Sequence, residues 1–459
     1  MGTVRRYDMD MSSGPLFPKI VRFSVPLLLS LVLQLAFDAA DMAVIGNFAS
    51  HESLAAIGAT NHITTFLLAL VLGVAGGANV VAAQRYGAGD RRGMSRTVHT
   101  AVALALFSGA VMTAVGVSAA RSLLELTRTP PDILARACLY LRLRFLGIPF
   151  LLLYSFGSVL MRAVGDTRRP LYYLAAAGAV NLALNLLLVV VFRMDVAGVA
   201  LATAVSKSLS AYLVLRALGR DRGPGRLILS RVRFYGSELG SILRIGIPSG
   251  LQSSCFALSN VIIQAAINSF GAAAIAGNTA SVMLEAMLHT TTAAMYQATL
   301  SFTGQNFGAR RYDRVVRSIL ICLGCSLAVS IVLGWGACPV GARLLGIFND
   351  HPEVVALGMI RLRIMFSTHF LAGAMDIVSG GLRGMGRSIA PAIVTLLGAC
   401  AFRIFWLATV FQEHRSLAVL YSSYPVSWLI VLGVNGAVLY LLCRRLPRRG
   451  GRSAARGDV

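Results

Sequence analysis

Twelve apolar runs, each long enough to cross a lipid bilayer, constrain the fold of this chain more than any other feature. A membrane-spanning helix needs about 20 apolar residues, and only helices and closed barrels satisfy their backbone hydrogen bonds inside lipid. Runs of this length predict helices, so we expect an all-α polytopic membrane protein. The runs lie near residues 20–46, 53–83, 97–119, 133–156, 171–192, 196–217, 241–268, 273–304, 317–338, 354–377, 389–411 and 417–443.

Basic residues give the chain a formal net charge of +23, although only 13% of its residues are charged and 56% are hydrophobic. In a soluble chain such a charge would suggest nucleic acid, but here the arginines cluster between apolar runs, after even-numbered spans and at the termini. The positive-inside rule then places both termini in the cytoplasm. The N-terminus lacks a signal-peptide cleavage pattern. We expect a multi-pass protein of the cell membrane, in contact with lipid and without nucleic acid.

The chain repeats itself at an offset of 221 residues. QRYGAGDRR from Gln84 returns as QNFGARRYD from Gln305, and SVLMRAVGDTRRP from Ser158 returns as SGGLRGMGRSIAP from Ser379. An even number of spans in each copy predicts two six-helix lobes related by a pseudo-two-fold axis along the membrane normal. The predicted parts are a cytoplasmic N-terminal segment (1–19), an N-lobe (20–219), a cytoplasmic linker (220–240), a C-lobe (241–443) and a basic tail (444–459).

Three polar residues share one face of the first span. Gln34, Asp38 and Asp41 are spaced four and three residues apart, as neighbours on a helix are. A carboxylate at the centre of a membrane helix costs at least ~2.5–3.5 kcal/mol, so the default hypothesis is a cation or proton site in a transporter. The alternative is that both acids lie at the wet end of the span and only solvate it.

Five motifs in order resemble the MATE (multidrug and toxic compound extrusion) family. They are DAADMAVIGNFASHESLAAIGAT, AQRYGAGD, NLALNLLLVVVFRMDVAGVALAT, GQNFGA and GLRGMG. The resemblance runs from about residue 15 to 443. The sodium-coupled branch carries an acid in span seven, where this chain has Phe256. The chain is therefore more similar to the branch named for DNA-damage-inducible protein F.

The resemblance implies two lobes around a V-shaped cavity and export of organic cations or amphipathic compounds in exchange for H⁺ or Na⁺. It implies that Asp41 is the first-span acid and Asn181 the fifth-span asparagine of a coupling site. Asn185 stands where many members carry a second acid, and Asp38, one turn from Asp41, is a candidate replacement for that charge. Asp41, Asp38, Asn181 and Asn185 are the predicted cation-coupling residues.

Seven further polar residues inside spans are predicted to line the substrate cavity. Glu285 and His289 lie four residues apart on one face of span eight. They either form a substrate or proton site or satisfy each other's hydrogen bonds at a contact between helices. Asp376 in span ten either lines the cavity or is bonded locally, with Arg383 as a partner. The set is Gln34, Lys207, Asn260, Gln264, Glu285, His289 and Asp376.

Three of these polar positions keep specific alternatives open. Lys207 lies midway along span six, and it pairs with Asp38 or Asp41, lines the cavity or is structural. Asn260 and Gln264 form a polar pair at helical spacing, and most such amides act as interhelical hydrogen-bond donors and acceptors.

Pro26, near the start of span one, is a candidate hinge. A proline inside a helix removes one backbone hydrogen bond and permits a bend. The hypothesis is that span one bends as Asp41 gains or loses a proton. The alternative is a proline that marks the start of the helix.

No phosphate-binding GxxxxGK[ST] motif and no loop large enough for a catalytic domain occur in the sequence. We therefore predict a non-enzymatic, monomeric secondary antiporter without cofactor or metal, driven by H⁺ or Na⁺, that exports small cationic or amphipathic substrates by alternating access. The alternative is a flippase for lipid-linked precursors from a related superfamily. Flippases carry several cations in the cavity, whereas only Lys207 and Arg403 are evident mid-span cations here.

Overall fold

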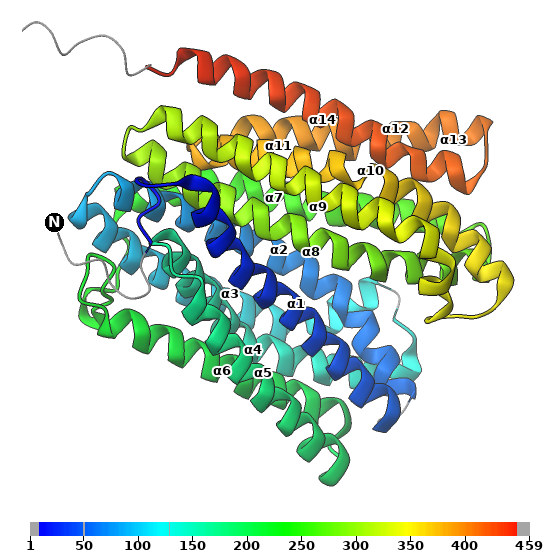
Figure 1. Cartoon of the computed structure of the whole chain (residues 1–459). Helices are drawn as coiled ribbons and strands as arrows, with labels where there is room; N and C mark the ends of the chain where they lie inside the picture. The colour runs from blue at the N-terminus through cyan, green and yellow to red at the C-terminus, as the bar shows by residue number, and fades with distance from the viewer. Residues whose placement is uncertain (1–8, 49–50, 128, 448–459) are drawn as a thin grey trace, which may run out of the picture.

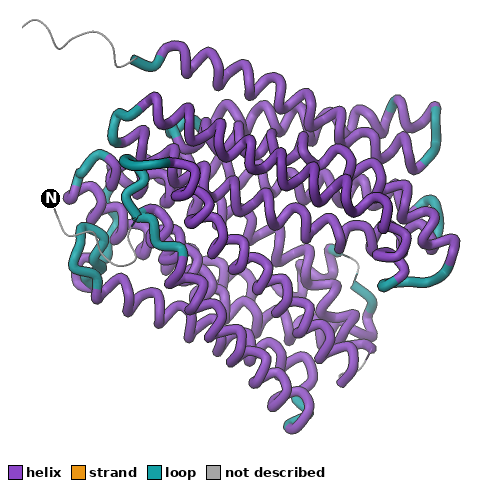
Figure 2. The backbone as a smooth tube through the Cα atoms, in the orientation of Figure 1, coloured by secondary structure: helices purple, strands orange, loops and turns teal. Residues whose placement is uncertain are grey.

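A computed structural model describes residues 9–48, 51–127 and 129–447, and these ranges are helical almost throughout, without a strand (Figure 2). The α-helices are α1 (Leu16–Phe48), α2 (His51–Gly87), α3 (Arg91–Leu126), α4 (Pro131–Ala163), α5 (Arg168–Asn185), α6 (Asp195–Arg220), α7 (Gly236–Asn268), α8 (Ala272–Gly308), α9 (Tyr312–Gly346), α10 (Pro352–Gly384), α11 (Ile389–Thr395), α12 (Phe402–Ala408), α13 (Val410–Glu413) and α14 (Leu417–Arg445). Two π-helices, Leu186–Val191 and Leu396–Ala401, continue α5 and α11, and a 3₁₀-helix covers Leu229–Arg231.

Eleven helical spans in the described residues are long and apolar enough to cross a membrane, with α11 to α13 forming a single span. The prediction of an all-α membrane protein is confirmed. The twelfth predicted span corresponds to α8, which is long but less apolar than the others. This helix packs against α2, α9 and α10, so its polar residues contact protein.

The helix bounds keep the offset of the sequence repeat. The starts of α2 and α8, at residues 51 and 272, lie 221 residues apart, as do those of α4 and α10, at residues 131 and 352. We call α1 to α6 the N-lobe and α7 to α14 the C-lobe. Most helices extend several residues beyond the predicted apolar runs.

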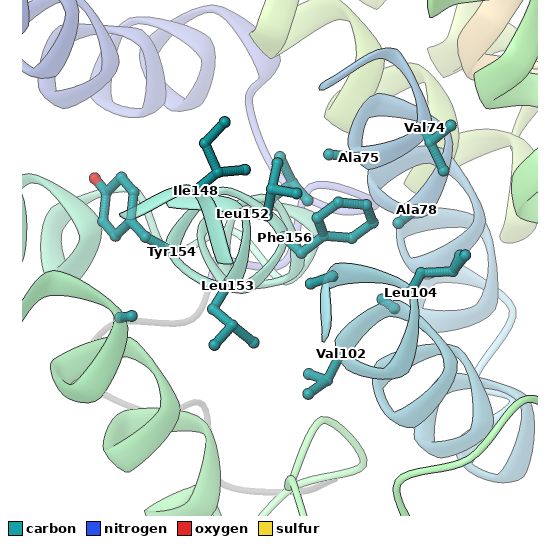
Figure 3. Packing of buried hydrophobic residues seen from close by; sticks show 14 of the residues in the cluster. Val74, Ala75, Ala78, Val102, Leu104, Ile148, Leu152, Leu153, Tyr154 and Phe156 are labelled. Atoms are coloured by element: carbon teal, nitrogen blue, oxygen red, sulfur yellow. The ribbon is translucent and has the colours of Figure 1, made fainter. Parts of the chain in front are cut away.

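The N-lobe core is formed by three neighbouring helices. Val74 and Ala78 on α2, Val102 on α3 and Phe156 on α4 are buried in one cluster, and Figure 3 shows the Phe156 ring facing Ala78. Large apolar side chains also cover the outside, such as Val332, which is 69% exposed. An apolar exterior around a packed interior is what a lipid-embedded bundle requires.

One end of the bundle holds the start of α1, residues 221–235 between the lobes and the end of α14, and we call it the linker end (Figure 1). The lobes pack closely there. A side chain at Gly87 of α2 would clash with the backbone of Gln305 of α8, and one at Gly73, nearer the middle of α2, would clash with the backbone of Gly250 of α7. Only glycine permits such close approach of two helices.

Hydrogen bonds reinforce this contact between the lobes. Gln84 Nε2 donates to the Gly384 carbonyl at 2.8 Å, and Gln305 Nε2 donates to the Ala163 carbonyl at 2.6 Å. Residues 9–15 join both lobes, since the Met9 amide donates to the Val164 carbonyl of the N-lobe at 3.3 Å and the Met11 amide donates to Gln305 Oε1 of the C-lobe at 3.2 Å.

The opposite end, which we call the open end, shows the reverse arrangement. Figure 1 shows the helices of the two lobes diverging towards it. In the described residues, the hydrogen bonds between the lobes lie at the linker end or near mid-helix, the most distant from the linker end being Ser254 Oγ to the Phe66 carbonyl at 3.4 Å. The structure is therefore sealed at the linker end and separated at the other.

Candidate functional site

A carboxylate on α1 and two amides on α5 form the polar centre of the N-lobe. Asn185 Nδ2 donates to Asp41 Oδ1 at 2.6 Å and lies 3.3 Å from Asn181 Oδ1. Both asparagines are buried. Asp41, Asn181 and Asn185 are thus brought together, as predicted, and we call them the N-lobe polar centre.

The backbone around this centre is specialised. The π-helix Leu186–Val191 begins directly after Asn185, and π-helical turns occur frequently at functional sites because they shift the hydrogen-bond register of the backbone. A side chain at Gly178 would clash with the ring of Phe37, so α1 and α5 approach closely here. The close approach places the α1 carboxylate within reach of the α5 amides.

Asp38 and Gln34 lie on the same helix but are exposed. Lys207 on α6 and Arg144 on α4 act electrostatically on both Asp38 and Asp41. Within the described ranges no ion pair shorter than 4.0 Å joins either acid to a cation. Lys207 therefore lies near the acids without forming a salt bridge with them. Arg144 was not among the predicted site residues.

Pro26 lies inside α1, ten residues after its first residue. The alternative that it marks the start of the helix is therefore wrong. Its carbonyl accepts a hydrogen bond from Ser30 Oγ at 2.7 Å. The helix continues through the proline in this structure, and the bending hypothesis stays a prediction.

The C-lobe contains a different polar centre, organised around a buried arginine. Arg361 on α10 forms an ion pair with Glu285 on α8 at 2.7 Å and donates to Asn278 Oδ1 at 3.0 Å. Tyr421 on α14 donates to the same oxygen at 3.2 Å. We call Glu285, Arg361, Asn278 and Tyr421 the C-lobe polar centre. Since Glu285 pairs with Arg361, the interpretation of Glu285 and His289 as a self-satisfied pair is wrong.

Aromatic rings surround the arginines of this lobe. The Arg361 guanidinium lies 5.3 Å from the ring centre of Tyr421 and 5.5 Å from that of Tyr424. Arg403 lies 4.1 Å from the Tyr424 ring, and its Nε donates to Ser427 Oγ at 3.0 Å. Both arginines are buried. Stacking on aromatic faces stabilises guanidinium groups that burial removes from water.

The other predicted C-lobe residues extend or flank this centre. Gln264 Oε1 accepts from Asn278 Nδ2 at 3.1 Å, which connects it directly, whereas Asn260 Oδ1 accepts only a 3.5 Å bond from Tyr424. The His289 ring lies 6.4 Å from that of His369. The interpretation as an amide that hydrogen-bonds between helices therefore fits Gln264 better than Asn260.

Asp376 lies near the linker end of α10. His289 and Arg383 act on it electrostatically, but Arg383 donates its hydrogen bonds to Tyr296 and Gln252. The expected bond between Asp376 and Arg383 is therefore absent from the part of the chain that the structure describes.

A cavity of about 480 Å³ lies between the lobes, where α2 faces α7 and α8. Its only charged lining residue in the described ranges is Arg383. The predicted cavity residues do not line it. The lining residues are Thr65, Leu68, Ala69, Leu72, Gly73, Gly76, Val80, Ile245, Ser249, Ser253, Tyr296, Gln297, Leu300 and Arg383.

Among the described residues, no group of three or more His, Cys, Asp or Glu side chains is placed to hold a metal ion. The site therefore offers single carboxylates with amide or guanidinium partners. Such groups bind and release a proton, or supply part of the coordination of a monovalent cation.

Two separate parts of this chain, one in each lobe, match the same known protein family. The pattern of the MatE family matches residues 26–187 and again 248–407. The probable multidrug resistance protein YpnP of Bacillus subtilis (strain 168) is 27% identical over 434 residues, covering 95% of each chain. YoeA of the same organism, also a probable multidrug resistance protein, is 24% identical and covers 89% of this chain and 90% of its own.

Two solved structures have similar folds. One is described as the outward-facing conformation of a multidrug resistance MATE family transporter, with a TM-score of 0.89 at 19% identity. The other is a MOP superfamily transporter from Pyrococcus furiosus Vc1 with a binding pocket of reversed polarity, with a TM-score of 0.89 at 20% identity. In both comparisons the match covers 95% of this chain and 98% of the solved one.

Proposed function

This chain belongs to the MATE family of multidrug efflux transporters, and from that premise we propose that it is a secondary antiporter. It exports organic cations or amphipathic compounds in exchange for H⁺, with Na⁺ as the alternative coupling ion. The observation that carries the proposal is the 2.6 Å hydrogen bond that holds Asp41 against Asn185. A carboxylate fixed inside a membrane protein by an amide is suited to bind a cation reversibly.

The arrangement of the lobes supports a direction for the cycle. By the positive-inside rule the linker end faces the cytoplasm, since arginines concentrate in its loops. The sealed linker end then corresponds to a state open to the outside. In this state Asp41 takes up the incoming cation, and the substrate leaves.

Alternating access requires the linker-end contact to open. Cation binding at Asp41 changes its hydrogen bond with Asn185, and α1 responds by bending at Pro26. The first residues of α1 pack against the C-lobe, where Leu16 and Phe23 share a cluster with Phe302. A bend in α1 would therefore act on the contact between the lobes. Substrate and cation compete because each binds one state better than the other.

Transport in reconstituted vesicles tests this proposal. The full chain is placed in proteoliposomes with a fluorescent organic cation, and a H⁺ gradient and a Na⁺ gradient are imposed separately. We expect movement of the dye with the H⁺ gradient. Movement with the Na⁺ gradient alone would assign the other ion, and no movement with either gradient would refute antiport.

One observation favours the flippase as a second candidate. Arg383 and Arg403 are buried in the C-lobe without an ion pair in the described residues, and Arg383 is an interior cation that the sequence did not indicate. Such cations suit a pyrophosphate group. Translocation of a fluorescent lipid, measured in the same vesicles without the dye, separates this function from drug efflux.

A further inference from the structure

The linker between the lobes forms a basic pocket that the proposed transport cycle does not use. A cavity of about 380 Å³ is lined by Arg96, Ser230, Arg231, Arg233 and Tyr235, without an acidic residue. In the described ranges, these three arginines form no ion pair. Three uncompensated guanidinium groups around one cavity make it a site for an anion.

The pocket is held in shape by bonds to α3. The Ile228 amide donates to His99 Nε2 at 3.0 Å, and the Tyr235 amide donates to Thr100 Oγ1 at 3.2 Å. His99 is buried, and its Nδ1 lies 2.6 Å from the Ser95 carbonyl, which leaves Nε2 as the acceptor. The linker therefore lies against the first turns of α3.

Tyr235 positions two of the arginines. Its ring centre lies 4.8 Å from the Arg233 guanidinium and 5.7 Å from that of Arg96. Stacking on a ring restrains the guanidinium groups while their N–H donors stay available. The site is thus organised before any ligand binds.

Apolar side chains stand beside these cations. Leu229 is 75% exposed and Phe234 is 46% exposed, and the Phe234 ring packs edge-on against Phe107 of α3 at 6.0 Å. Phe107, itself 59% exposed, lies about 16 Å further along the membrane-spanning helix than Arg96. The linker therefore presents cations at the helix end and apolar groups towards the membrane interior.

We propose that this pocket binds the phosphate of an anionic phospholipid, whose acyl chains lie against Phe234 and Phe107. A free anion would need only the arginines, whereas a lipid uses both the charge and the adjoining apolar surface. Clusters of basic residues at a membrane boundary attract anionic headgroups, each arginine contributing to the affinity. The site depends on the membrane-embedded fold and not on the transport function.

Native mass spectrometry of the full chain tests the proposal, with dioleoyl phosphatidylglycerol, dioleoyl phosphatidylcholine and inorganic phosphate as probes. The pocket variant Arg231→Gln/Arg233→Gln should bind phosphatidylglycerol roughly 30-fold more weakly than the unaltered chain. The control Arg222→Gln/Arg226→Gln removes equal charge from exposed residues of the same linker that do not line the pocket. This control should retain the affinity of the unaltered chain.

A third variant, Phe234→Ser, separates lipid from free anion, because it should weaken binding of phosphatidylglycerol but not of phosphate. Equal losses in the pocket and control variants would overturn the proposal. So would equal affinity for phosphatidylcholine, or displacement of the lipid by equimolar phosphate. All variants alter surface side chains, and size-exclusion chromatography in detergent verifies that each is folded.

Discussion

The two lobes repeat one fold, but each surrounds its interior carboxylate with a different partner, an amide in the N-lobe and an arginine in the C-lobe. In the N-lobe polar centre, Asp41 accepts a hydrogen bond from Asn185 and has no salt bridge within the described residues. In the C-lobe polar centre, Glu285 is neutralised by Arg361 at 2.7 Å. A carboxylate without a fixed counter-ion can exchange a cation, whereas an ion-paired one is held in place. The comparison supports our proposal that the first lobe carries the coupling site, whereas the second lobe holds its carboxylate in a fixed ion pair.

The largest effect should come from Asp41→Asn. Because the amide cannot ionise, gradient-driven dye transport in proteoliposomes should fall to the level of protein-free vesicles. Asp132→Asn, at an exposed position at the start of α4, makes the same chemical change and should leave transport intact. Unchanged transport by Asp41→Asn would remove the basis for the comparison.

The second effect concerns stability in the C-lobe. Arg361→Gln leaves Glu285 largely buried without its partner, which should lower the free energy of unfolding by about 3 kcal/mol. Denaturation in detergent micelles measures this loss. The double variant Glu285→Gln/Arg361→Gln should lose less than the sum of the two single variants, because no unpaired charge remains.

An exposed ion pair provides the control for this stability measurement. Arg121 and Glu125 form a 2.8 Å pair with side chains 71% and 51% exposed. Arg121→Gln should therefore change the stability little. Additive losses at Glu285 and Arg361 would mean that the C-lobe carboxylate is not held by its arginine.

A smaller effect should follow from Asn185→Ala. Loss of the hydrogen bond leaves Asp41 less well positioned, and coupled transport should slow roughly tenfold, as expected for one bond to a charged group. Asn435→Ala removes a buried amide in the C-lobe, where Asn435 donates to Ser379 Oγ at 3.3 Å. That control should leave the rate per folded molecule unchanged, and an equal slowing would show a general packing effect.

The smallest effect should be that of Tyr424→Phe. The ring over Arg403 is retained and only the 3.5 Å bond to Asn260 is lost. We expect a change below about 0.5 kcal/mol in the free energy of unfolding. Tyr424→Ala, which removes the ring, should cost about 3 kcal/mol. Similar losses in both variants would show that the hydroxyl, and not stacking, stabilises this region.

Sequence reasoning predicted most of the fold because hydropathy marks each membrane span and the repeat at an offset of 221 residues divides the spans between two lobes. The start of α1 is an exception, since this helix begins at Leu16, four residues before the predicted span. Leu16 and Ile20 are buried against the C-lobe at the linker end. Packing between the lobes, and not lipid, therefore sets where the first helix begins.

The candidate site was predictable only in part. The meeting of Asp41 and Asn185, separated by 144 residues, followed from the family resemblance. The burial of Arg361 was missed because the residue lies near the end of its apolar run. Its partners, Glu285 on α8 and Tyr421 on α14, come from other helices. Spacing along one helix cannot reveal partners that neighbouring helices supply.

The glycines at the linker end have a mechanical consequence. Gly87 and Gly308 each lie against the backbone of the facing helix, α8 and α2 respectively, and these helices run for 37 residues, about 55 Å. A methyl group added at either glycine would push the two helices apart at that point, and the separation would increase along their length. Displacements of a fraction of an ångström there would be magnified many times at the far tips. We therefore expect these two glycines to set how far apart the helices can lie at the open end.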